Sequence, residues 1–122
     1  MWGLAGAMLA ISVGAASAQT APPWEGYWAA NAAWCAQAGE VGEGTPDWYG
    51  RDGLFGLEWS CDISRIAPIG MAQSWAVGLA CLDAGYEFHE SQIFLLTDND
   101  RLLILDETGV TANLVRCAGD RK

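Results

Sequence analysis

The sequence contains little positive charge. Its 122 residues include only six Lys and Arg against fifteen Asp and Glu, which gives a formal net charge of −9. Binding to nucleic acid requires a basic surface, and so does binding to an anionic membrane. The composition therefore argues against both kinds of partner. Two interpretations of the acidity remain open: it keeps the protein soluble, or it steers the protein toward a basic partner.

Histidine and closely spaced cysteines are also scarce. The chain has one histidine, His89, and no CxxC pair, so we expect no metal site and no cofactor. A nucleophilic triad would have to be built around His89, which lies in a strand-like stretch. Carboxylate pairs such as Asp52 and Glu58 arise by chance in so acidic a chain. We therefore expect a protein that is not an enzyme.

No hydrophobic run reaches the length of about twenty residues that a membrane span needs. Residues 1–18 carry no charge and end in the small-x-small pattern Ala16-Ser17-Ala18, which predicts a signal peptide cleaved before Gln19. The run departs from that pattern in one respect, because no basic residue precedes Arg51. A buried N-terminal helix is the alternative, but the run has no amphipathic face. We expect a single domain over residues 19–122, periplasmic or secreted, with no membrane span.

Four cysteines lie in that domain, and an even number in an exported chain of this size indicates two disulfides. Three pairings are possible. Cys61 and Cys81 are centred on a turn-like stretch, residues 68–71, so a hairpin folding there would place them opposite each other. Cys35 would then pair with Cys117.

Two stretches of alternating hydrophobicity support this hairpin. Leu57, Trp59, Cys61 and Ile63 alternate with polar residues, which is typical of a half-buried strand. In residues 74–82 the large side chains again fall on one face. The hairpin register places Ile63 opposite Leu79, so large residues of both strands share a face.

The rest of the chain predicts an all-β fold. Asn31 is a candidate cap for a short helical turn that Gly39 ends, and residues 40–53, rich in Gly, Pro and acids, predict a long loop. Further strands are expected over 24–28, 86–89, 92–97, 101–106 and 112–117. This organisation predicts a small antiparallel β-barrel or sandwich of about six or seven strands, monomeric and stapled by two disulfides.

The Asp98-Asn99-Asp100 stretch has two interpretations. It is similar to the start of a calcium loop, to which Asp106 could add an oxygen ligand. The Gly and the terminal Glu expected in such a loop are missing, which favours a plain hairpin turn.

Aromatic residues give the main candidate site. The acidic loop contains Trp48 and Tyr49, and Phe55 follows it. Trp and Tyr often anchor protein interfaces or stack on sugars. The candidate binding residues are therefore Asp47, Trp48, Tyr49, Asp52 and Phe55. Alternatively, these aromatic side chains fold back to cover an open barrel end. Under either interpretation, Trp28, Trp59 and Trp75 are expected in the core.

Several short motifs carry a resemblance. GYW at residues 26–28, WC at 34–35, GLEWSCDI at 56–63 and LVRC at 114–117, with Cys81 between them, resemble small uncharacterised bacterial periplasmic proteins with two disulfides. The resemblance covers most of residues 24–117 and implies no activity. In broad shape the chain is also similar to small β-barrel inhibitors of periplasmic proteases and lysozymes, as an analogy of fold.

These observations lead to a hypothesis and two alternatives. The hypothesis is a protein-binding module whose partner is basic, such as a lysozyme or a protease that it inhibits. The first alternative is a glycan or small-ligand module that uses Trp24, Trp48 and Tyr49 as stacking surfaces. The second is a structural protein of the envelope.

Overall fold

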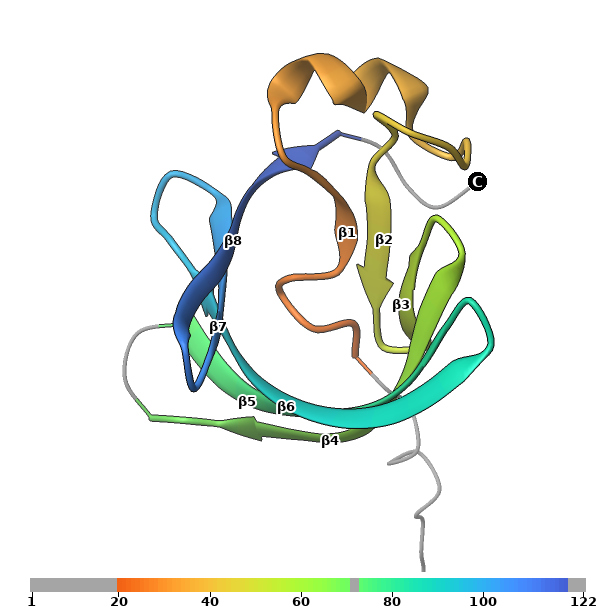
Figure 1. Ribbon diagram of the computed structural model, residues 1–122. Coiled ribbons are helices and arrows are strands. Elements are labelled where there is room, and N and C mark those ends of the chain that lie inside the picture. Colours follow the sequence, from red (N-terminus) through yellow and green to blue (C-terminus); the bar gives the residue numbers. More distant parts are fainter. Residues whose placement is uncertain (1–19, 71–72, 119–122) are drawn as a thin grey trace, which may run out of the picture.

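The computed structural model describes residues 20–70 and 73–118, which form a closed antiparallel barrel of eight strands (Figure 1). The predicted signal peptide and Gln19 lie outside the described residues. The elements are β1 (Gly26–Ala29), the 3-10 helix η2 (Ala32–Gln37), β2 (Asp47–Gly50), β3 (Gly53–Gly56), β4 (Trp59–Pro68), β5 (Gln73–Asp83), β6 (Tyr86–Leu96), β7 (Arg101–Asp106) and β8 (Gly109–Cys117). No helix among the described residues is long and apolar enough to cross a membrane.

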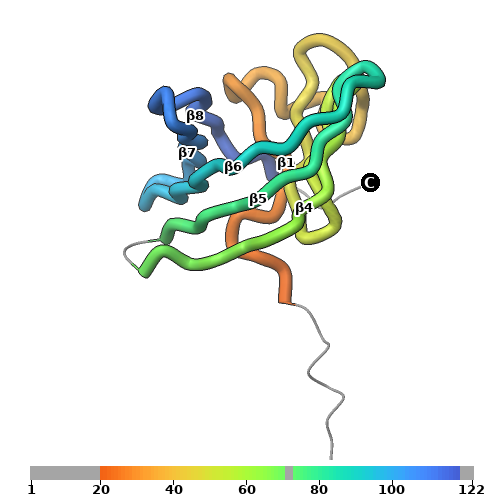
Figure 2. The backbone as a smooth tube through the Cα atoms, turned by 60° about the horizontal axis from the view of Figure 1, so that its bottom comes forward, coloured from red at the N-terminus to blue at the C-terminus, as the bar shows by residue number. Residues whose placement is uncertain are grey.

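Each strand pairs with the next one in the chain, and β8 pairs with β1 to close the barrel. Because neighbouring strands are antiparallel, the connections alternate between the two ends. We call the end with the turns at 57–58, 84–85 and 107–108 the mouth, and the end with the turns at 51–52 and 97–100 the base. The long strands β4, β5 and β6 run side by side and form one wall (Figure 2).

The predicted hairpin and both disulfides are confirmed. Cys61 lies opposite Cys81 across β4 and β5, and Ile63 lies opposite Leu79. Cys61 is bonded to Cys81, and Cys35 is bonded to Cys117. The turn at 97–100 joins β6 to β7, as the plain hairpin interpretation of that stretch predicts.

Several predicted boundaries differ from the structure. The loop predicted over 40–53 is wrong from Asp47 onward, where the chain forms β2, a turn at 51–52 and the start of β3. The two strands predicted within 86–97 are one continuous strand, β6. The expected strand at Trp24 begins only at Gly26, and Asn31 forms no side-chain capping hydrogen bond to η2. The barrel therefore has eight strands instead of six or seven.

The interior of the barrel is filled mainly with aromatic and aliphatic side chains. The largest fully buried ones are Trp24, Trp28, Phe94, Leu54, Leu79, Leu102 and Val77. Of the tryptophans predicted in the core, Trp28 is fully buried, and Trp59 and Trp75 are half-buried against the core cluster. This packing fixes the strand register, since a slip of one residue would turn each strand's apolar side chains outward.

An N-terminal segment, residues 20–25, runs inside the ring of strands before β1 begins (Figure 1). Arg116 of β8 holds it in place by donating hydrogen bonds to the carbonyl oxygens of Pro23 and Glu25, each at 2.7 Å. The same guanidinium pairs with Asp100 at 2.9 Å and lies 4.5 Å above the ring of Trp28. One side chain thus joins the N-terminal segment, the last strand and the turn between β6 and β7.

A second, smaller cluster lies on the outer face of the barrel. Its buried members are Tyr27, Ala29 and Cys117, and Cys35, Ala38, Trp48 and Val115 pack against them. The helix η2 thereby lies over the seam between β1 and β8, with the Cys35–Cys117 disulfide at its centre.

Candidate functional site

The five candidate binding residues are divided between the two faces of the barrel wall. Successive side chains of a strand point to opposite faces. Asp47 and Tyr49 therefore point inward from β2, and Trp48 points outward. Phe55 lies opposite Trp48 on β3 and also points outward. Asp52 is exposed in the turn between these strands. The five side chains therefore do not share one face of the wall.

Two of the three aromatic side chains suggested for sugar stacking are buried. Trp24 is fully buried and Tyr49 is 9% exposed, so neither side chain offers an open ring face. Tyr49 instead stacks on Phe94, with ring centroids 5.7 Å apart, and Trp24 meets Phe94 edge-on at 4.9 Å. These rings fill the inside of the barrel.

On the outside, Trp48 and Phe55 line a groove of about 150 Å3, which we call the outer groove. Trp48 is held there by a hydrogen bond from Nε1 to Asp52 Oδ1 at 3.1 Å and by an edge contact with Tyr27 at 5.1 Å. The other lining residues are Tyr27, Gly39, Glu40, Val41, Thr45, Pro46, Gly56 and Leu57. Val41 is 75% exposed and Leu57 41% exposed, so the groove has an apolar rim. It is a preformed surface of aromatic, apolar and acidic groups.

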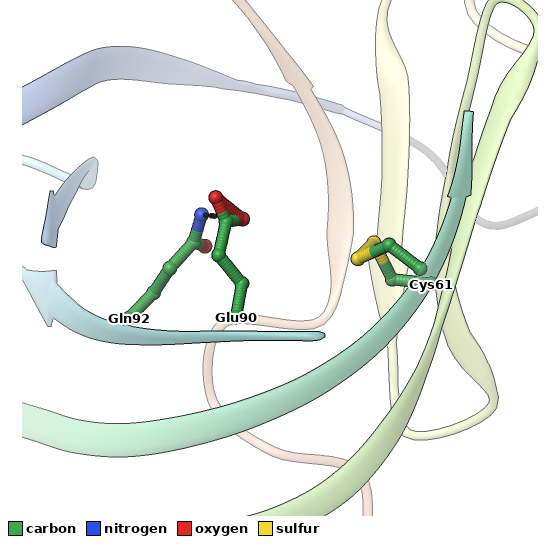
Figure 3. Close-up of a disulfide and its surroundings, with 4 residues drawn as sticks. Cys61, Glu90 and Gln92 are labelled. Atoms are coloured by element: carbon green, nitrogen blue, oxygen red, sulfur yellow. Dashed lines mark hydrogen bonds between the residues drawn. A yellow bond between two sulfur atoms is a disulfide. The ribbon is translucent and has the colours of Figure 1, made fainter. Parts of the chain in front are cut away.

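On the inside, a half-enclosed cavity of about 260 Å3 lies beneath the turns of β3–β4 and β5–β6; we call it the mouth cavity. It is lined by Tyr49, Leu54, Trp59, Cys61, Leu79, Cys81, Asp83, Phe88, Glu90 and Gln92. Glu90 and Gln92 extend from β6 into the barrel, beside the Cys61–Cys81 disulfide (Figure 3). Gln92 Nε2 donates to Glu90 Oε1 at 3.1 Å.

The sequence prediction missed Glu90 and Gln92. The signal that could have revealed them is the alternation along β6, where Phe88, Phe94 and Leu96 occupy positions of the same parity. Because the prediction divided this segment into two strands, the alternation was not followed from Phe88 to Leu96. His89, the only histidine, has the opposite parity and is exposed.

No family model, curated protein or solved structure matches this chain. The function of its candidate sites is therefore inferred from the geometry of the structure alone. Among residues 20–70 and 73–118, no three His, Cys, Asp or Glu side chains gather to hold a metal ion, and no cysteine is free. Two formed disulfides are typical of a protein in an oxidising compartment.

Asp47 has an unusual environment. Burial raises the pKa of its carboxyl group from 3.8 to about 6, because removal from water disfavours the charged form. Burial also raises the pKa of Tyr49, and the negative charge of Asp47 adds to that increase. The side chains of Asp47 and Tyr49, both on the inner face of β2, are therefore close enough to interact electrostatically.

We expect Asp47→Asn to stabilise the protein at pH 7.5 and to have little effect near pH 4. The pKa of Asp47 is higher in the folded protein than in the unfolded chain. The protonated carboxyl therefore contributes its full stabilisation below about pH 4, and this stabilisation is lost as the pH rises through about 6. The full shift corresponds to about 3 kcal/mol, which we reduce to about 1–2 kcal/mol because solvent screens a part-exposed group. Urea unfolding of the variant and the wild type at both pH values measures this difference in the free energy of unfolding.

The matched control is Asp62→Asn, which removes the same charge from an exposed position on β4. It should change the free energy of unfolding by less than about 0.5 kcal/mol at both pH values. An Asp47→Asn protein no more stable than the wild type at pH 7.5 would contradict the buried, disfavoured carboxylate.

Proposed function

We propose that this chain is an exported, non-enzymatic module that binds a basic protein in the outer groove and inhibits a basic hydrolase such as a lysozyme or a protease. The observation that carries the proposal is the fixed Trp48 indole beside an apolar, acidic rim. Aromatic side chains held in place before binding lose little conformational entropy in a complex, and they are frequent interface hot spots.

Charge supports the choice of a basic partner. Glu40 lines the outer groove and Glu43 is exposed in the same loop, within a chain of net charge −9. Complementary charge accelerates association and suppresses unsuitable partners, while the apolar contacts supply affinity. Binding should therefore weaken as salt is added, and the loss should appear mainly in the association rate.

The test measures the activity of lysozyme and a panel of basic proteases with micromolar protein in low salt. We expect at least one of them to be inhibited. Val41→Asp should weaken that complex more than tenfold, which is about 1.4 kcal/mol, because it places a charge on the apolar rim. Val110→Asp is the matched control, since Val110 is also well exposed, at 60%, but lies by the turn between β7 and β8.

Two outcomes would overturn the proposal. Full activity of every enzyme in the panel would remove the inhibitory role. Equal weakening by Val41→Asp and Val110→Asp would show that a partner binds elsewhere than in the outer groove.

A further inference from the structure

The polar pair inside the barrel needs an explanation beyond stability. Along the inner face of β6, Glu90 and Gln92 stand between Phe88 on one side and Phe94 on the other. Placing a carboxylate among apolar side chains costs free energy unless it is well paired. Within the described residues, the Glu90 carboxylate accepts one hydrogen bond, which comes from the neutral side-chain amide of Gln92.

The shape of the mouth cavity limits what it can hold. Its volume of about 260 Å3 lies below the usual range for drug-sized ligands, about 300–1,000 Å3. The disulfide Cys61–Cys81, with Leu54 and Leu79, forms an apolar part of the lining. The rest of the interior is filled by the core, so the cavity suits a small head group.

The chemistry of the lining determines the charge of the occupant. Its acidic groups are Asp83 and Glu90, and no Lys, Arg or His belongs to the lining. Asp47 adds a further carboxyl on the inner face of β2, two residues before Tyr49. An anion would be repelled here, whereas a cation would gain from each of these groups.

Aromatic rings supply the second element of a cation site. Trp59 and Phe88 line the cavity together with Glu90. Cations bind favourably to the faces of aromatic rings, most strongly to Trp, and a carboxylate adds a charge-assisted hydrogen bond to an N–H donor.

We propose that the mouth cavity is a binding site for a small organic cation, an alkylammonium or alkylguanidinium, with Glu90 as its ion-pairing partner and Trp59 and Phe88 as its aromatic wall. Gln92 positions the Glu90 carboxylate. This site lies inside the barrel and is independent of the outer groove, so either proposal can fail without the other.

The test follows the indole N–H of Trp59 and the side-chain amide of Gln92 by NMR during titration. The probes are n-butylguanidinium and n-butylammonium, with n-butanol and butyrate as neutral and anionic controls of similar size. Both cations should shift these two signals with saturable, millimolar or tighter affinity. Butanol should bind at least tenfold more weakly, and butyrate should give no saturable shift.

Two pairs of variants locate the site. Glu90→Gln should weaken cation binding at least tenfold, while Glu87→Gln, which removes the same charge from an exposed position on β6, should change it less than twofold. Trp59→Leu should also weaken it, whereas Trp34→Leu on η2 should not. Thermal unfolding of each variant confirms that it is folded.

Three results would overturn the inference. Equal binding of butanol and the cations would show an apolar cavity without charge selectivity. Equal effects of Glu90→Gln and Glu87→Gln would remove the ion pair. Shifts confined to residues of the outer groove, or no shifts at all, would show that the mouth cavity is not the site.

Discussion

Replacing Cys35 and Cys117 together by Ala should lower the free energy of unfolding by about 4.5 kcal/mol, against about 3 kcal/mol for Cys61 and Cys81, in the chain-entropy model. The difference follows from the sequence separations of the two disulfides, 82 and 20 residues. A domain of this size has a total stability of about 5–15 kcal/mol, so either loss is a large fraction of it.

The position of the Cys35–Cys117 disulfide gives a second reason for the larger effect. It joins η2, which follows the four-residue strand β1, to the end of β8, and β1 and β8 form the seam that closes the barrel. The other disulfide joins β4 and β5, which already pair along most of their length. Loss of Cys35–Cys117 should therefore loosen the seam first, and backbone amides of β1 should exchange faster with solvent.

Urea unfolding of the two double variants, with their native disulfides checked by peptide mapping, measures both effects. In the Cys61→Ala, Cys81→Ala protein, Cys35 and Cys117 should remain linked. A smaller loss for the Cys35–Cys117 variant than for the Cys61–Cys81 variant would show that the seam is held mainly by other contacts, such as those of Arg116.

The sequence predicted the part of the fold in which alternation is long and the turn is clear. The β4–β5 hairpin was found because Cys61 and Ile63 on one strand match Cys81 and Leu79 on the other. The β2–β3 hairpin was missed because its strands have four residues each and contain glycines that also suit a loop.

Two of those glycines have structural reasons that appear only in three dimensions. Gly53 has φ +136°, a conformation that other residues rarely adopt, and a Cβ there would lie 2.7 Å from the carbonyl oxygen of Cys61. A Cβ on Gly56 would overlap the indole of Trp59. Close packing against β4 therefore selects glycine within these strands, and composition alone cannot distinguish this from a flexible loop.

The candidate site was predicted only in part for a related reason. Acidic and aromatic residues adjacent in sequence suggested one surface, but strand alternation sends Trp48 outward and Tyr49 inward. Conversely, the mouth cavity combines residues from β2 to β6 that are far apart in the sequence. Their proximity depends on closure of the barrel, which the sequence left open.

Trp24→Ala should lower the free energy of unfolding by about 3–5 kcal/mol, as expected for removing a fully buried large aromatic side chain. Trp24 contacts Phe94 inside the barrel, and its backbone carbonyl accepts a hydrogen bond from Trp28 Nε1 at 2.9 Å. The N-terminal segment is thus a packed part of the core, although it belongs to no strand. Urea unfolding measures the loss.

Trp24→Phe should cost much less, about 1–2 kcal/mol, because two effects oppose each other. The smaller ring leaves a gap, but the substitution also removes the Trp24 Nε1–H, a buried donor with no hydrogen-bond partner among the described residues. Such a donor costs about 1–3 kcal/mol, which the variant recovers. If Trp24→Ala cost less than about 1 kcal/mol, residues 20–25 would not be part of the core, and the contacts of Arg116 with Pro23 and Glu25 would be surface contacts only. If Trp24→Phe cost as much as Trp24→Ala, the Trp24 Nε1–H would not be an unpaired donor in the folded protein.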